Sequence, residues 1–186
     1  MSTRLSGIAI LLAGMLGGSR RAAAEPEVPE RVVGLLGAYR AVTVAEWRAL
    51  GPDAAPVLER VARDPAALPT RRARAVAALG AVSPAAAGPL IRELVVETSA
   101  PEVLRCAAVD AAPSVLGPAA AGVLAPLLRD LDPAVRLRSA QVLAGSAADG
   151  CHAVADQART LPASDPVARI AATCEARLRS KAPAGR

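Results

Sequence analysis

One stretch of this 186-residue chain indicates its fold: Asp132-Pro133-Ala134-Val135-Arg136-Leu137-Arg138-Ser139-Ala140-Gln141-Val142-Leu143. It begins with two residues that typically start a helix. An aspartate side chain accepts hydrogen bonds from the first free backbone N–H groups, and proline suits the first turn. The small residue Ala140 follows one turn after Arg136 and lets a partner helix approach closely. The stretch therefore predicts a helix that packs against a second helix.

Three further segments repeat this pattern at a nearly constant interval. They begin at Thr70, Pro101 and Asp165. When the segments are aligned on a shared arginine, successive arginines are 33, 31 and 33 residues apart, and an alanine follows each one three or four residues later. Self-similarity at such a period is the sequence signature of stacked structural repeats. The aligned residues are Arg72, Arg105, Arg136 and Arg169, followed by Ala75, Ala108, Ala140 and Ala172.

A second helix is predicted in each copy, because apolar residues recur there at the spacing of one helix face. These helices are expected over residues 52–63, 85–97, 119–129 and 148–160. Glycine and proline interrupt helices, so they mark where the first helices end. The expected ends are Gly80, Pro113 or Gly117, and Gly145.

The composition also favours an all-α fold. Hydrophobic residues make up 53% of the chain, but aromatic residues only 1%, and phenylalanine is absent. The apolar content is therefore alanine, valine and leucine, and alanine and leucine are among the best helix formers. A core of such small side chains requires helices to lie close together. The two aromatic residues, Tyr39 and Trp47, both precede the first aligned arginine.

The pattern Asp-Pro-x-Val-Arg-x-x-x-Ala, a Leu-Gly end and a second helix that closes on Leu-Leu-x-Asp resembles the HEAT repeat of armadillo-type helical solenoids. The best matches are residues 132–136 and residues 127–130, and the resemblance covers roughly residues 43–180. The copy at 70–97 lacks the Asp-Pro start. The resemblance implies an all-α, right-handed α-solenoid of four to five HEAT-like helix pairs with a protein-binding role.

The two ends of the chain predict export and capping. Residues 1–24 combine a basic start, a short apolar run and an Ala-x-Ala site, the pattern of a secretory signal peptide cleaved near Ala24. The alternative is a buried N-terminal helix. Residues 25–42 predict an N-terminal capping helix from Pro29 to Arg40, and residues 181–186 a disordered basic tail. No further apolar stretch is expected to span a membrane. The mature chain is expected in the periplasm or outside the cell.

The four aligned arginines are the candidate binding residues, since stacked repeats would place them in a ladder. One interpretation is internal pairing with Asp110, Asp132 or Asp165 and with backbone carbonyl groups. The other is an anion-binding stripe on a concave face. A pocket that joined Arg105 and Arg136 to Cys106 would favour this second interpretation. The candidates are Arg72, Arg105, Arg136 and Arg169.

No catalytic, metal or cofactor site is predicted. His152 is the sole histidine, and in a helix its neighbour Cys151 points about 100° away, so the two do not form a dyad. The sequence has no C-x-x-C or H-x-x-x-H spacing and no glycine-rich phosphate loop. In an exported protein, Cys151 and Cys174 are the preferred disulfide pair because they fall on adjacent helices, and Cys106 is left as a small buried residue.

These observations predict an exported, non-catalytic scaffold that binds a partner protein. The alternative is a lyase-like or anion- and cofactor-binding protein that uses the arginine ladder. A weaker alternative is a cytoplasmic nucleic-acid binder, which requires that no signal peptide is present. The net charge of the whole chain is +5, and residues 1–24 contain three arginines and no acidic residue, so the mature chain carries +2. This small excess argues little for nucleic acid.

Overall fold

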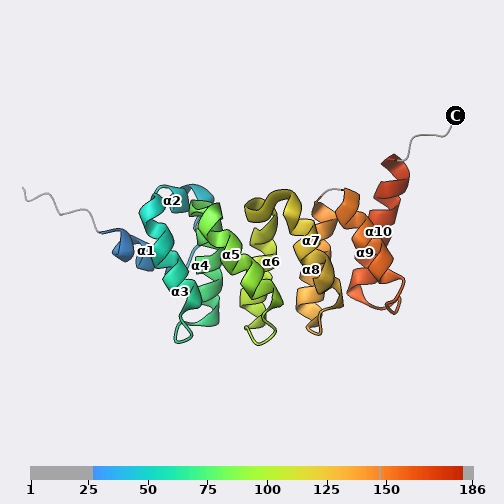
Figure 1. Cartoon of the computed structure of the whole chain (residues 1–186), viewed down its shortest axis with the longest axis horizontal. Coiled ribbons are helices and arrows are strands. Elements are labelled where there is room, and N and C mark those ends of the chain that lie inside the picture. Colours follow the sequence, from blue (N-terminus) through green and yellow to red (C-terminus); the bar gives the residue numbers. More distant parts are fainter. Residues whose placement is uncertain (1–26, 147, 182–186) are drawn as a thin grey trace, which may run out of the picture.

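The computed structural model describes residues 27–146 and 148–181. Every regular element in these two ranges is a helix (Figure 1), so the described chain is all-α, as its composition predicts. The predicted signal peptide over residues 1–24 lies outside the described residues. The same holds for residues 182–186, which make up most of the predicted tail.

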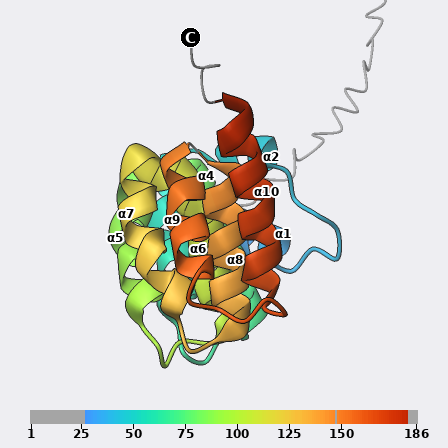
Figure 2. The ribbon, with the colours of Figure 1, turned by 90° about the vertical axis from the view of Figure 1, so that its right-hand side faces the viewer.

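The helices stand side by side in two rows, which Figures 1 and 2 show from two directions. The arginine row carries the four aligned arginines, and the second row alternates with it along the chain. Each helix packs against its neighbours in sequence and against the next helix of its own row. The arginine row comprises α4 (Pro69–Val82), α6 (Glu102–Leu116), α8 (Pro133–Gly145) and α10 (Pro166–Lys181). The second row comprises α3 (Ala55–Arg63), α5 (Pro84–Val96), α7 (Ala120–Leu124) with the 3-10 helix η3 (Ala125–Arg129), and α9 (Ala148–Ala158).

Two short helices close the N-terminal end of the rows. The helices α1 (Val28–Leu36) and α2 (Val44–Arg48) pack against α4, and the 3-10 helix η1 (Pro52–Ala54) leads into α3. The predicted helix from Pro29 to Arg40 is longer than α1, the helix that the structure has there. The helix α1 ends at Leu36 with Gly37 as its C-cap, and residues 38–43 form a loop that leads to α2.

Alanine makes close helix packing possible in this core. Ala75, Ala108 and Ala140, each about one turn after an aligned arginine, are fully buried. A methyl side chain lets the neighbouring helix approach closely, and interiors must be filled at high density. On α10 the expected position is shifted by one residue, because Ala171 is buried while Ala172 is exposed.

Glycine also acts inside a helix and not only at its end. The prediction that Gly80 ends the first helix is wrong, because α4 continues through it to Val82. A Cβ atom at Gly80 would lie 3.1 Å from the Cγ2 atom of Val115 on α6, so the glycine permits close contact of these helices. The helix α6 continues through Pro113 and ends at Gly117, whose φ of 56° is a left-handed conformation that favours glycine.

The helix predicted over residues 119–129 is divided into α7 and η3. Pro126 has no backbone N–H to donate within a helix, and the chain tightens into a 3-10 helix from Ala125 onward. The longer stretch Glu102–Arg129 is a candidate membrane span by length and composition alone, although no such span was expected from the sequence. In the structure Gly117 divides this stretch, and α6 and α7 pack against each other.

The predicted aspartate N-caps are confirmed. The Oδ1 atom of Asp132 accepts hydrogen bonds from the backbone N–H groups of Ala134 at 2.8 Å and Val135 at 3.4 Å. The Oδ1 atom of Asp165 accepts one from the backbone N–H of Val167 at 2.8 Å. Both aspartates thus satisfy donors that the first helical turn leaves free.

A disulfide between Cys151 and Cys174 joins α9 to α10. Their Cα atoms are 5.0 Å apart, and both side chains are almost fully buried. Two further observations show that the same helix pair lies close against the end of α8. Arg177 donates a hydrogen bond to the carbonyl of Ala144, and any side chain at Gly150 would collide with the carbonyl of Leu143.

We expect Cys174→Ser to lower the free energy of unfolding of the oxidised protein by about 3 kcal/mol, because the disulfide closes a loop across a sequence separation of 23 residues. Urea denaturation with and without dithiothreitol measures the change. Reduced wild type should match the reduced variant, and the partly exposed Cys106→Ser should serve as the neutral control. Equal stability of oxidised wild type and Cys174→Ser would contradict a structural role for the bond.

Candidate functional site

Two of the four aligned arginines clamp the ends of second-row helices. The Nε atom of Arg72 donates a hydrogen bond to the carbonyl of Ala62 in the last turn of α3 at 2.9 Å. The Nη2 atom of Arg105 donates to the carbonyl of Val95 in the last turn of α5 at 3.1 Å. Each acceptor precedes its arginine by ten residues. The last carbonyl groups of a helix have no partner within the helix, so a guanidinium group is well suited to this position.

Arg105 also forms a buried ion pair with Asp130, which follows η3. Two of its nitrogen atoms donate to the two carboxylate oxygens, and the side chains are only 4% and 8% exposed. The hydrogen bond from Arg105 lowers the pKa of Asp130, although burial acts in the opposite direction. The buried Nε atom of Arg105 has no hydrogen-bond partner among the described residues, so the pair is held by the other two guanidinium nitrogens.

The other two arginines differ from each other. Arg136 donates hydrogen bonds to the carbonyls of Asp130 at 2.8 Å and Leu131 at 3.2 Å, and it lies 3.8 Å from the carboxylate of Asp165 at the start of α10. Arg169 on α10 is exposed. Three of the four predicted binding arginines are thus engaged by intramolecular partners that connect successive helices.

A groove of about 590 Å³ crosses a different face of the arginine row. Three helices that are neighbours in the arginine row each contribute four residues. The spacing i, i+3, i+4 and i+7 places these residues on one face of each helix. The three sets are equivalent positions of the aligned segments, at −2, +1, +2 and +5 from the shared arginine. They are Thr70, Ala73, Arg74 and Ala77 on α4, Val103, Cys106, Ala107 and Asp110 on α6, and Ala134, Leu137, Arg138 and Gln141 on α8.

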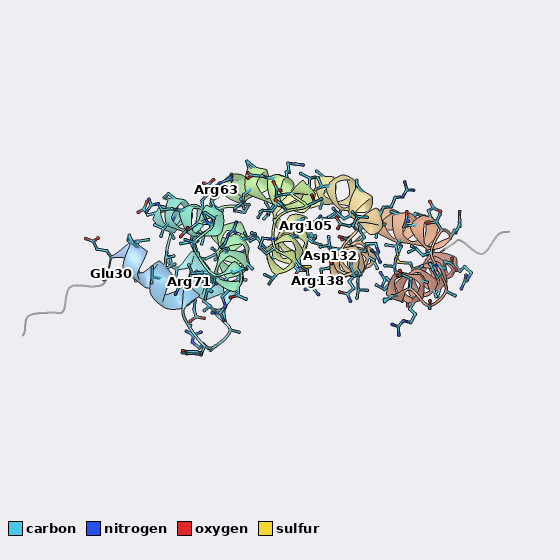
Figure 3. All side chains as sticks on the ribbon, turned by 90° about the horizontal axis from the view of Figure 1, so that it is seen from below. Glu30, Arg63, Arg71, Arg105, Asp132 and Arg138 are labelled. Carbon is cyan, nitrogen blue, oxygen red and sulfur yellow. A yellow bond between two sulfur atoms is a disulfide. The ribbon has the colours of Figure 1, made fainter. Side chains whose placement is uncertain are left out.

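Small side chains form the floor of the groove. Ala73, Ala77, Ala107 and Ala134 carry only methyl groups, which leaves the surface hollow between the longer side chains around them. Val103 on α6 lines the groove as well and is 39% exposed. In Figure 3 the lower side of the array bows inward between α1 and α10, and Arg71 and Arg138 lie on that side while Arg63 lies on the opposite one.

Charged groups at the groove come from neighbouring helices. Arg138 on α8 forms a bidentate ion pair with Asp110 on α6, at 2.5 and 2.6 Å, and both side chains are exposed. Arg74 on α4 has no carboxylate within ion-pair distance among the described residues. Its Nη1 atom donates to the carbonyls of Leu36 at 3.0 Å and Ala38 at 2.7 Å, which holds the loop after α1 against α4.

A smaller cavity, the notch, adjoins the groove at this loop. It has a volume of about 190 Å³ and shares Arg74 and Ala77 with the groove. The indole of Trp47, which is only 7% exposed, forms one of its walls. The remaining lining residues come from α1 and from the loop before α2. They are Leu35, Ala41 and Val42.

The loop beside the notch, residues 38–43, is also held at the end that leads into α2. Thr43 and Glu46 form a capping box at the start of α2, and Arg40 forms an ion pair with Glu46. The hydrogen bond from Arg40, followed by those from the backbone and hydroxyl of Thr43, lowers the pKa of Glu46 to about 2. Because this pKa is depressed in the folded state, these contacts stabilise the loop above the ordinary glutamate pKa and are lost as the pH falls toward 2.

Cys106 and His152, which carry reactive side chains, lie on different helices, α6 and α9. Cys106 lines the groove and is partly exposed, so the prediction of a buried residue is wrong, and burial is the main cause that raises the pKa of its thiol. Arg105 and Arg136 do not line the groove with it. His152 is exposed on α9. Across residues 27–146 and 148–181, no group of three or more histidine, cysteine or acidic residues could hold a metal ion.

A concave surface was expected from the sequence, but the residues that line the groove and the notch were not identified from it. The prediction centred on the arginine of each segment, and the groove residues flank that arginine. The spacing i, i+3, i+4 and i+7 and the four alanines among these residues could be read from the sequence, but the sequence alone does not tell which face of a helix is left uncovered. Comparison of the chain with protein-family models, curated proteins and solved structures finds no match.

We expect Arg105→Ala to lower the free energy of unfolding by about 3–5 kcal/mol, because it leaves the carboxylate of Asp130 buried without its partner. Urea denaturation followed by circular dichroism measures the loss. The exposed Arg169→Ala is the matched control and should change stability by no more than about 0.5 kcal/mol. Similar losses for both variants would contradict a stabilising role for the ion pair between Arg105 on α6 and Asp130 after η3.

Proposed function

We propose that this chain is an exported, non-catalytic scaffold that binds a partner protein in the groove of the arginine row. The observation that carries the proposal is the groove itself, which equivalent residues of α4, α6 and α8 build together. A surface that continues from one repeat to the next suits an extended partner, whereas a small-molecule site is enclosed and has a few convergent polar groups.

The proposal includes the finer architecture implied by the HEAT resemblance. In it, four to five helix pairs over residues 43–180 form a right-handed α-solenoid, and a capping helix within residues 25–42, here α1, precedes the first pair. The alternation of the two rows and the packing of each helix on its sequence neighbours support this arrangement. In such an array each unit contacts only its neighbours, and one side is free for a partner.

The internal contacts of the arginines favour the scaffold over the anion-binding alternative. Arg72, Arg105 and Arg136 have acceptors within the chain, so their charge already stabilises the joints between helices. An anion or cofactor that bound to Arg105 would have to displace the buried carboxylate of Asp130. The groove needs no such rearrangement to accept a ligand.

Binding in the groove can be tested by placing a photo-crosslinking amino acid at Val103, which lines the groove. Val96 at the end of α5 is the matched control, since it is an exposed valine outside the groove. We expect Val103 to give one discrete adduct with a protein of the same compartment, and Ala107→Glu to abolish it. Equal adducts from both positions, or none from Val103, would contradict a binding role for the groove.

Export can be tested independently of binding. We expect the full chain, expressed with a C-terminal tag in a Gram-negative host, to appear in the periplasmic fraction with its N-terminus near residue 25. Mass spectrometry of the purified protein identifies that terminus. The same tagged chain with Leu11→Arg and Leu12→Arg is the control, because charges interrupt the apolar run that a signal peptide requires. An uncleaved protein in the cytoplasm would overturn the export part of the proposal.

A further inference from the structure

We infer that the partner segment is an acidic peptide that places a carboxylate at Arg71 and Arg74 and an aliphatic side chain in the notch against Trp47. This inference rests on the proposed function, since it specifies the ligand of the same groove. It follows from the uneven distribution of charge along the groove and from the apolar notch at one end of it.

The charge of the groove is uncompensated only at its α4 end. At the other end, the bidentate contact with Asp110 neutralises Arg138. Arg71 and Arg74 on α4 have no carboxylate within ion-pair distance among residues 27–146 and 148–181. Arg71 is exposed on the same side of the array (Figure 3), and its Nη2 atom would lie 3.8 Å from a Cβ atom at Gly37, so it also reaches the loop beside the notch.

The guanidinium of Arg74 retains donors for a ligand. Its hydrogen bonds to the carbonyls of Leu36 and Ala38 both use Nη1, which leaves Nε and Nη2 without an acceptor among the described residues. These contacts hold the side chain in place but leave its charge intact. A carboxylate is the group that matches a positioned guanidinium best, because two parallel N–H donors can bind its two oxygen atoms.

The notch supplies an apolar anchor next to these charges. Trp47 and Val42 line a cavity of about 190 Å³, which accommodates one aliphatic side chain, and Arg74 lines both the notch and the groove. An apolar residue and an acidic residue close together in a peptide would therefore reach the notch and the guanidinium groups at once. Apolar anchors in well-formed pockets dominate the affinity of protein interfaces.

The loop beside the notch presents the remaining aromatic residue. Tyr39 is fully exposed on the loop that Arg74 holds. The capping box of Thr43 and the ion pair between Arg40 and Glu46 fix the far end of the loop. A fixed loop with an exposed tyrosine is a ready contact surface, since tyrosine is enriched in interfaces and loses little conformational freedom on binding.

The experiment uses the full chain and a display library of random 12-residue peptides that lack tryptophan. Peptides selected on the protein are synthesised, and binding is followed by the emission of Trp47, the single tryptophan of the chain. We expect the selected peptides to be enriched in Asp or Glu beside Leu, Ile or Val, and to shift that emission. Replacing their acidic residues by the corresponding amides should weaken binding about tenfold, because the charge is lost while the shape is kept.

Variants of the protein locate the site. Arg71→Gln should weaken binding of the selected peptides about tenfold, whereas Arg92→Gln, an exposed arginine on the second row, should leave it unchanged. Circular dichroism confirms that both variants fold. Ala107→Glu places a negative charge on the groove floor and should abolish binding of these peptides.

The outcomes separate this inference from the proposed function. Selected peptides that are not acidic, but whose binding Ala107→Glu still abolishes, would overturn the inference and leave the groove as a protein-binding site. Failure to select any peptide, or peptides insensitive to Ala107→Glu, would overturn both. Tighter binding of a single-stranded 12-nucleotide DNA at the same arginines would assign the charge to nucleic acid and also overturn the inference.

Discussion

Contact between small side chains is the constraint on which the rest of this structure depends. With one tryptophan, one tyrosine and no phenylalanine, the helices fill a dense core only if they approach one another closely. The buried alanines after the aligned arginines and the interface position of Gly80 both serve this approach. Other small residues lie on the uncovered face of α4, α6 and α8, where Ala73, Ala77 and Ala107 leave a hollow. The groove is thus a by-product of the composition that the core requires.

The arginines stabilise the contacts between helices that the alanines allow to approach one another closely. Helix ends carry carbonyl groups without partners, and Arg72 and Arg105 satisfy such groups on the preceding second-row helices. Arg105 then reaches Asp130, and Arg136 approaches Asp165, so that each connects its own helix to the next unit of the chain. A periodic charge in such a sequence can therefore stabilise the contacts between helices and leave another face of the same helices open.

The N-terminal cap, formed by α1, α2 and the loop between them, does more than close the end of the two rows. It contributes both aromatic residues of the chain, and its loop is held by Arg74, a residue of the groove. The notch formed by Trp47 and Val42 adjoins a surface that is otherwise lined by alanine, and the uncompensated charges lie at the same end. The proposed site thus joins features that the repeats share to features found only in the cap. The repeats would supply a general surface, and the cap the selectivity for one kind of segment.

The sequence by itself determined the helical class, the periodic arrangement of its segments and the aspartate caps at Asp132 and Asp165, because these depend on local backbone chemistry and on spacing. Cys151 and Cys174 could be paired at that level, since they fall on consecutive helices. Only the tertiary structure decided that α4 passes through Gly80 and that Asp130 is the partner of Arg105. It likewise decided which helix face is left open as the groove. These features depend on the rotation and distance of neighbouring helices, which residues far apart in the chain set together through packing.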